Sequence, residues 1–193
     1  MGQKMKIEQY VMAYGVEHDR LRAILPDEFT SLRPVLRFNA EIKDGESAYL
    51  EFNTAVEKDG KRGWINIGFW ENIEFIREGK TVIFRNNLLQ ISFESVGVVG
   101  SCPAEKDNAG CFFLGNDEGF RPAEIITSNK EFCDCDFKWL IDNGAYGKSA
   151  RMTLPAYPEE VTNIYPKSEF TIENAATIHC NQVLGTYMVV FDR

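Results

Sequence analysis

Two turn signals constrain the fold most strongly, because they divide residues 34–73 into three segments of alternating character. Asp59-Gly60 is the signal for a two-residue type I′ hairpin, since both central residues of that turn need positive φ. Asp44-Gly45-Glu46 favours a three-residue loop, because this length keeps the flanking apolar residues on one face. The sequence therefore predicts an antiparallel meander with strands at 34–43, 47–58 and 61–73.

Counting outward from the two turns gives the expected register of the meander. Phe38 is expected opposite Phe52 across the first turn. Across the second turn, Phe52 is expected opposite Ile67, and Leu50 opposite Phe69. These residues then share one face, as expected for a sheet with one buried side.

The second face of the meander carries an unusual mixture of amides, charged groups and aromatic rings. It holds Arg37, Asn39, Glu41, Tyr49, Glu51, Asn53, Trp64, Asn66, Gly68 and Trp70. Such a mixture is expected where a concave surface binds a small polar ligand. The alternative is a solvated face whose two Trp are covered by a loop or a partner, because antiparallel sheets commonly have one wet side.

Roles can be assigned to these residues if the face lines a pocket. The register places Glu51 beside Asn39 and opposite Gly68, which would leave open space above the sheet. Glu51 and Glu41 are the candidate catalytic acid–base residues. Arg37 is suited to binding a substrate carboxylate bidentately, the alternative being that it pairs with one of these acids. The candidate substrate-binding residues are Arg37, Asn39, Asn53, Trp64, Asn66, Trp70 and Tyr49.

Composition limits the classes of protein and partner. The 193 residues, 44% hydrophobic and 12% aromatic, are expected to form one globular domain over residues 1–193. A net charge of −8 argues against nucleic acid and anionic membranes as partners. No signal-peptide pattern or membrane-length apolar run is found, so a cytoplasmic location is expected. No nucleotide-binding fingerprint is found, and no cofactor is predicted.

The five cysteines do not suggest a disulfide framework, because their number is odd and no secretion signal accompanies them. Four of them offer an alternative, a zinc site formed by Cys102, Cys111, Cys133 and Cys135. Their C-x8-C and C-x-C spacings differ from the usual two-residue zinc knuckle. Buried free thiols are the commoner outcome, so no metal is predicted.

The rest of the chain is also rich in strand signals. Strands are expected near residues 6–14, 81–84 and 88–99, a helix over 16–25, and two further strands within 170–191. The predicted fold class is mainly β (α+β): an antiparallel β-barrel or cone-like sheet with one or two short helices.

The opening pattern resembles the acetoacetate decarboxylase-like superfamily over roughly the first hundred residues. A strand is followed by a short helix ending in Arg22-Ala23-Ile24-Leu25-Pro26, then by Val35-Leu36-Arg37-Phe38 and Tyr49-Leu50-Glu51-Phe52 of the meander. The resemblance implies a barrel or cone with a small-molecule pocket in its mouth. The decarboxylases of that family use a Schiff-base lysine beside a second lysine. No two lysines are adjacent in this chain, and Lys106, Lys130 and Lys138 are single.

The functional expectation is a pocket for a small carboxylate or keto-acid-like metabolite, with lyase-like chemistry if the protein is an enzyme. The alternative is a non-catalytic interaction or structural protein whose Trp-bearing face is a subunit interface. A homo-oligomer is compatible with either alternative.

Overall fold

The computed structural model describes residues 2–101, 108–115, 119–149 and 162–193. The described residues form thirteen strands of one sheet and two short helices. The strands are β1 (Lys6–Gly15), β2 (Thr30–Lys43), β3 (Ser47–Lys58), β4 (Lys61–Glu71), β5 (Glu74–Glu78), β6 (Thr81–Arg85), β7 (Leu89–Gly100), β8 (Gly110–Phe113), β9 (Gly119–Pro122), β10 (Lys130–Trp139), β11 (Tyr146–Lys148), β12 (Gln182–Val183) and β13 (Thr186–Asp192). The helices are α1 (His18–Ile24) and α2 (Ile172–Ala176).

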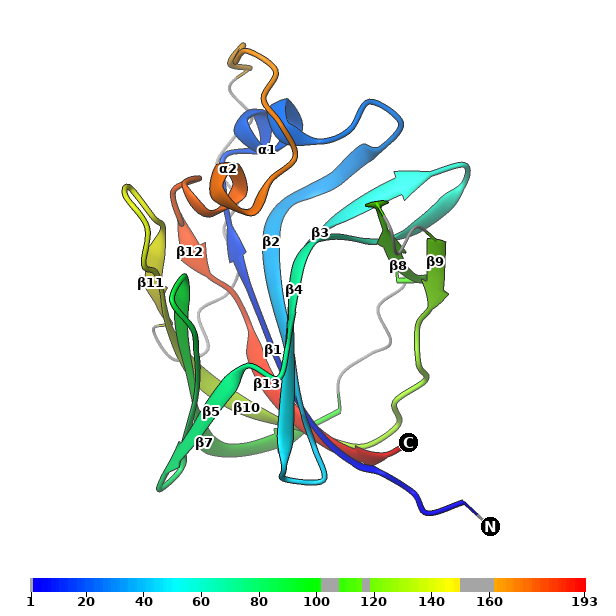
Figure 1. Cartoon of the computed structure of the whole chain (residues 1–193), viewed down its shortest axis with the longest axis vertical. Helices are drawn as coiled ribbons and strands as arrows, with labels where there is room; N and C mark the ends of the chain where they lie inside the picture. Colours follow the sequence, from blue (N-terminus) through cyan, green and yellow to red (C-terminus); the bar gives the residue numbers. More distant parts are fainter. Residues whose placement is uncertain (1, 102–107, 116–118, 150–161) are drawn as a thin grey trace.

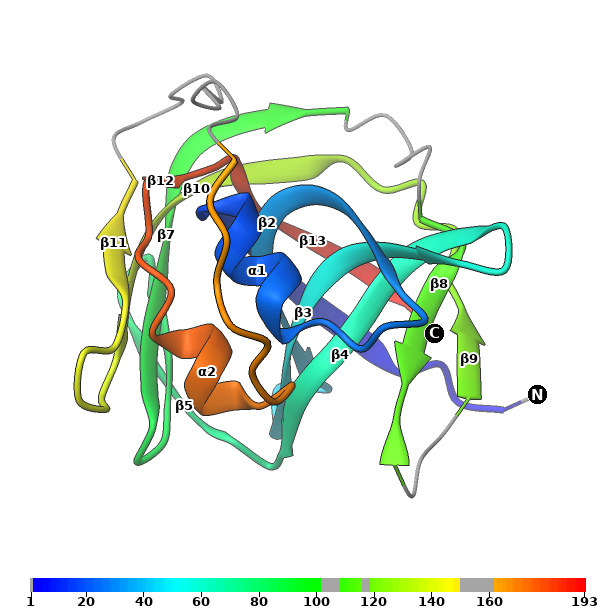
Figure 2. The same cartoon turned by 90° about the horizontal axis from the view of Figure 1, so that it is seen from above.

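The sheet curves strongly around its central strands. Its order is β5-β6-β7-β10-β13-β1-β2-β3-β4-β8-β9, with β11 paired to β10 and β12 to β1. The pairing of β4 with β8 is parallel, and it extends the meander into a second short hairpin, β8–β9. Figures 1 and 2 show the sheet curling from β1 through β10 and β7 to β5, with β8 and β9 on the other side of the meander. The predicted mainly β, cone-like architecture is confirmed.

The interior of the curved part is filled by aromatic side chains. Phe38 and Phe52 stack with ring centroids 5.0 Å apart, as the expected pairing of these residues requires. Trp139 packs edge-on against Phe52 at 5.0 Å and donates its indole N–H to the hydroxyl of Tyr14 at 3.3 Å. Aromatic pairs of this kind add about 0.5–1.5 kcal/mol each beyond the burial of their area. The interior of this part of the sheet is therefore a packed core.

Both helices cover one end of this core (Figure 2). Leu21 and Ile24 of α1 and Ala175 and Ala176 of α2 are buried in it. The hydroxyl of Thr171 caps α2 by accepting from the backbone N–H of Asn174 at 3.1 Å. No helix in the described ranges combines the length and the apolar character that crossing a membrane requires.

Both turns of the meander form as predicted. Asp59 and Gly60 have φ of 50° and 76°, the left-handed values that a type I′ turn needs. Lys43 pairs with Ser47, which leaves a three-residue loop between β2 and β3. The expected pairing of Asn39 with Glu51 is also confirmed.

The register of β4 departs from the prediction at a β-bulge. Asn53 pairs with Asn66, but the next pair is Phe52 with Gly68, so Ile67 is an extra residue and the expected Phe52–Ile67 pair is wrong. Beyond the bulge every side chain lies on the face opposite to the expected one. Phe69 now lies opposite Glu51, and Trp70 lies opposite Leu50. The bulge thus directs Phe69 to the face that carries Glu51, and Trp70 to the face that packs against the aromatic core.

Gly68 is correspondingly closed on the core side and does not leave open space beside Glu51. A Cβ atom at Gly68 would lie 2.3 Å from Cδ1 of Ile172. Glycine at this position therefore lets α2 approach the sheet closely.

Candidate functional site

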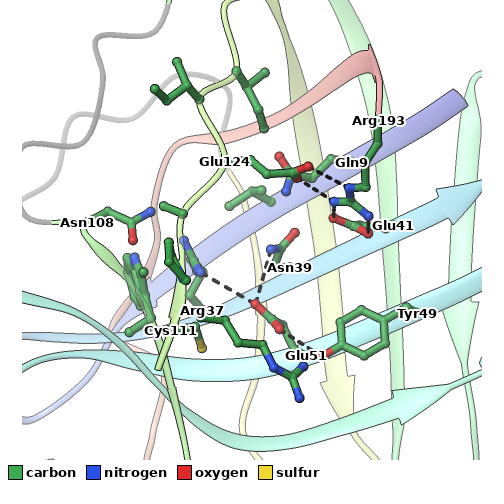
Figure 3. Close-up of a pocket in the computed structure, with 18 of the residues that line it drawn as sticks. Gln9, Arg37, Asn39, Glu41, Tyr49, Glu51, Asn108, Cys111, Glu124 and Arg193 are labelled. Atoms are coloured by element: carbon green, nitrogen blue, oxygen red, sulfur yellow. Dashed lines mark hydrogen bonds and ion pairs between the residues drawn. The ribbon is translucent and has the colours of Figure 1, made fainter. Parts of the chain in front are cut away.

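A cavity of about 630 Å³ lies on the face of the meander that turns away from the aromatic core. Its floor comes from β1, β2, β3 and β4, and its far wall from β8, β9, residues 123–126 and the end of the chain. Figure 3 shows Glu51 near the centre of this cavity, with side chains from several strands directed toward it.

The Glu51 carboxylate is buried and surrounded by hydrogen-bond donors. Its side chain accepts from the hydroxyl of Tyr49 at 2.9 Å, from Nδ2 of Asn53 at 3.1 Å and from Nδ2 of Asn39 at 3.3 Å. Tyr49 and Asn53 flank Glu51 at alternate positions of β3, and Asn39 faces it from β2. The alternation of one strand and the register of the next therefore build this cluster.

Arg37 supplies the positive charge beside this carboxylate. Its Nη2 lies 3.9 Å from Oε1 of Glu51, and its Nε donates to Oδ1 of Asn53 at 2.9 Å. The guanidinium also lies 3.8 Å from the ring centroid of Trp64. Because Arg37 is only 7% exposed, these contacts hold it in place against Glu51. The structure therefore shows the alternative stated above, in which Arg37 pairs with an acid of the same face, and that acid is Glu51.

A second charged cluster forms the wall next to β13. Arg193 binds Glu41 with two hydrogen bonds, of 3.0 and 2.8 Å. It also binds Glu124 with two, of 2.7 and 2.6 Å. The hydrogen bonds that Arg193 donates lower the pKa of Glu124, and donating to the carboxylates of Glu124 and Glu41 raises the pKa of Arg193 itself. This cluster joins residues 123–126 to the meander across the cavity (Figure 3).

Two weakly acidic groups near Glu51 are kept protonated. Burial, followed by the charge of Glu51, raises the pKa of Tyr49 well above its usual range. The same two causes raise the pKa of the Cys111 thiol to about 12. Both groups are therefore neutral hydrogen-bonding groups at neutral pH.

The structure separates the predicted site residues into three sets. Those that line the cavity are Arg37, Asn39, Glu41, Tyr49, Glu51 and Trp64. Asn53 and Asn66 are buried on the same side of the sheet without lining the cavity. Trp70 lies beyond the bulge and packs against the aromatic core, with its ring 6.2 Å from that of Trp139. The expectation that Trp70 shares a face with Glu51 is wrong.

The expected Trp-bearing face is also absent as an exposed surface. Trp64 is 3% exposed beneath Arg37, and Trp70 packs against the core. Trp64 is covered by residues of its own chain, and the half-buried Trp70 lies on the other face of the sheet, so the two rings do not form the single surface that the subunit-interface alternative assumed.

Several residues that line the cavity were not identified from the sequence as site residues. They are Gln9, Cys111, Phe113, Arg121, Glu124, Lys130, Tyr187 and Arg193. Apart from Gln9 on β1, they lie on or next to β8, β9, β10 and β13, which are separated from the meander in the sequence by β5, β6 and β7. The parallel pairing of β4 with β8, which brings Cys111 beside Trp64, has no local sequence signal.

The cysteines suggested for zinc are divided between two environments. Cys133 and Cys135 belong to the aromatic core, whereas Cys111 lines the cavity. Cys102 lies outside the described residues. Within the described ranges, no group of three or more His, Cys, Asp or Glu side chains is arranged to hold a metal ion.

Comparison with known proteins identifies the fold. No protein-family model and no curated protein matches the sequence. Among solved structures, acetoacetate decarboxylase from Legionella pneumophila matches 99% of this chain and 84% of its own, with a TM-score of 0.55 and 13% identity. The enduracididine biosynthesis enzyme MppR complexed with pyruvate matches 100% and 88%, with a TM-score of 0.54 and 11% identity.

A third structure of the same kind is an acetoacetate decarboxylase-like enzyme from Sphingomonas wittichii, which matches 98% of this chain and 89% of its own. Its TM-score is 0.50 at 11% identity. Identities this low describe the path of the backbone and not the chemistry of the site. The chain thus has the fold of the acetoacetate decarboxylase-like enzymes, as its opening pattern predicted.

Proposed function

We propose that the cavity binds a small carboxylate or keto-acid-like metabolite, with Glu51 as its central polar group. The observation that carries this proposal is a buried carboxylate that faces a cavity of about 630 Å³ and is held by three donors. Holding a carboxylate in this way fixes its oxygens relative to any bound molecule. The pyruvate complex of MppR supports a keto acid as the ligand class, since that protein has a similar fold.

The proposed chemistry is lyase-like proton transfer. Glu51 would act as general acid or base at the carbon next to the ligand's carbonyl. Glu41 is less suited to this step, because Arg193 engages both of its carboxylate oxygens. We therefore assign Glu41 to anchoring Arg193, and Asn39, Tyr49 and Arg37 to positioning Glu51.

A Schiff base is a separate branch of the proposal. Among the described residues, Lys43 and Lys130 are the lysines that line the cavity. Borohydride trapping in the presence of pyruvate, read by intact mass and located by peptide mass, distinguishes the two chemistries. A reduced adduct on Lys43 or Lys130 would establish the imine, whereas an unchanged mass leaves proton transfer by Glu51 as the proposed chemistry.

Ligand binding itself is tested by a thermal-shift and calorimetric titration with pyruvate and acetoacetate. We expect Glu51→Gln to weaken binding roughly tenfold to a hundredfold, because the amide nitrogen that replaces Oε2 cannot accept the hydrogen bond of Tyr49, so the polar groups around residue 51 rearrange. The amide keeps the shape of the side chain, so the variant should remain folded. Glu57→Gln is the matched control, since Glu57 lies at the β3–β4 hairpin and pairs with the exposed Arg62. Equal affinities for the two variants would refute the assignment of Glu51.

A further inference from the structure

Three arginines line the cavity, and two of them are already committed to carboxylates. Arg37 is held against Glu51 and Asn53, and Arg193 is held between Glu41 and Glu124. Displacing either guanidinium onto a ligand would leave a protein carboxylate without its cation, at a cost in free energy. A ligand carboxylate therefore needs another partner.

Arg121 on β9 is the third arginine, and its guanidinium is placed differently. It lies 4.0 Å from the ring centroid of Phe113. Within the described part of the chain, no carboxylate pairs with it. Stacking on a ring occupies a face of the guanidinium and leaves its N–H edges for hydrogen bonds. The ring of Phe113 thus holds the guanidinium of Arg121 in place, and its N–H groups can donate hydrogen bonds to a ligand.

A row of aromatic rings supports this arginine. Phe113 is 5% exposed and meets Phe69 edge-on at 6.2 Å, and Phe69 lies 6.0 Å from the ring of Tyr49. Phe69 joins this row because the bulge at Ile67 turns it toward the cavity side. The row runs from Arg121 to Tyr49, whose hydroxyl donates to Glu51.

We propose that Arg121 binds the carboxylate of the ligand and thereby makes the cavity selective for acids over their neutral analogues. This inference rests on the proposed function, which supplies the ligand class. A planar guanidinium matches a carboxylate with two parallel N–H···O bonds. With the carboxylate at Arg121, the reactive end of a keto acid is directed across the cavity toward Glu51.

The electrostatics of the cavity agree with this placement. The positive charge of Arg121 acts on both Tyr49 and Cys111, where it opposes the increase in pKa that burial and Glu51 cause. The charges of Arg121 and Glu51 therefore act on the same two side chains, Tyr49 and Cys111. A ligand carboxylate brought near these side chains would meet Arg121 as its attractive charge and Glu51 as its repulsive one.

The lysines of the cavity are weaker candidates for this role. The ammonium of Lys130 lies 3.8 Å from the ring of Tyr187, and that of Lys43 lies 5.4 Å from the ring of Tyr49. An ammonium is a point charge and cannot present two fixed, parallel donors. Replacing Arg121 by lysine should for this reason recover only part of the affinity.

The test compares pyruvate with methyl pyruvate, its neutral ester, by calorimetric titration of the wild type, Arg121→Gln, Arg121→Lys and Arg62→Gln. Arg62 is the control, because it is an exposed arginine away from the cavity. We expect Arg121→Gln to weaken pyruvate binding roughly tenfold, as for the loss of a charge-assisted contact, and to leave ester binding unchanged. Arg121→Lys should fall between the wild type and Arg121→Gln, and Arg62→Gln should equal the wild type.

The failures of the two proposals are distinguishable. If wild-type protein binds pyruvate and Glu51→Gln weakens it, but Arg121→Gln binds it normally, the role of Arg121 is refuted and the proposed function stands. An equal loss of pyruvate and ester binding would also refute the role, since it would reflect a change in cavity shape. If the wild type binds no keto acid, the proposed function and this inference fail together. Because Arg121 is exposed, its replacement should not prevent folding.

Discussion

The buried pair of Arg37 and Glu51 allows a quantitative test of how the cavity is held together. Their side chains are 9% and 11% exposed, and the nearest charged atoms are 3.9 Å apart. At an effective dielectric constant of about 20, this distance corresponds to an attraction of about 4 kcal/mol. The proposed perturbation is Arg37→Met, alone and combined with Glu51→Gln.

The magnitudes follow from burial. Arg37→Met leaves a buried carboxylate without its cation, which should reduce the free energy of unfolding by about 3–5 kcal/mol. In the double variant Glu51→Gln removes that charge, and Asn39 and Asn53 can still donate to the amide oxygen. We therefore expect the double variant to be about 2–4 kcal/mol more stable than the sum of the single effects implies.

The assay is urea denaturation of the four proteins in a double-mutant cycle at neutral pH. Arg62 and Glu57 provide the control pair, since they are closer, at 2.8 Å, but are 55% and 36% exposed. Exposed pairs typically couple by no more than about 1 kcal/mol. If the buried pair couples no more strongly than this surface pair, burial does not decide the strength of the interaction and the reasoning is wrong.

Two further predictions concern single side chains. Because the pKa of Cys111 is raised from 9.0 to about 12, its thiolate should be roughly five-hundredfold rarer at pH 9 than that of an unperturbed thiol, and iodoacetamide should alkylate it far more slowly than in the unfolded chain. The fold favours the protonated thiol, so this contribution to stability is complete below pH 9 and is lost as the pH rises toward 12; rapid alkylation of the folded protein, located by peptide mass, would contradict it. Trp70→Leu should lower the free energy of unfolding by about 1–3 kcal/mol without changing pyruvate affinity, because Trp70 faces the aromatic core. A calorimetric titration that finds weakened binding would place Trp70 at the cavity after all.

The local parts of the fold were predictable because turns leave strong local signals. The three-residue loop at Asp44 sets the pairing of Asn39 with Glu51, and with it the centre of the candidate site, while Asp59-Gly60 sets the register of β4 as far as the bulge. The alternation of β3 then placed Tyr49, Glu51 and Asn53 on one side. These features depend on residues within about 20 positions of one another.

The rest of the site depends on contacts that the local sequence does not encode. The bulge is an example, since Ile67-Gly68-Phe69 continues an ordinary alternation and only the glycine gives a signal for it. Arg121, Glu124 and Arg193 reach the cavity through long-range pairings of β8, β9 and β13. Their contribution becomes visible only when the whole sheet is assembled.

The bulge at Ile67 also affects how this cavity can change over evolutionary time. Up to Asn66 the side chains of β4 keep the parity set by the hairpin, and from Gly68 onward they follow the opposite parity. Deleting Ile67 would remove the bulge and leave Phe69 opposite Glu51 and Trp70 opposite Leu50, whereas pairing Ile67 with Phe52 would exchange the environments of Phe69 and Trp70. The side of the sheet that Phe69 faces is therefore set by how the backbone accommodates Ile67 as well as by residue identity, and a chain with the same residues but a regular ladder through Ile67 would direct Trp70 toward the cavity side.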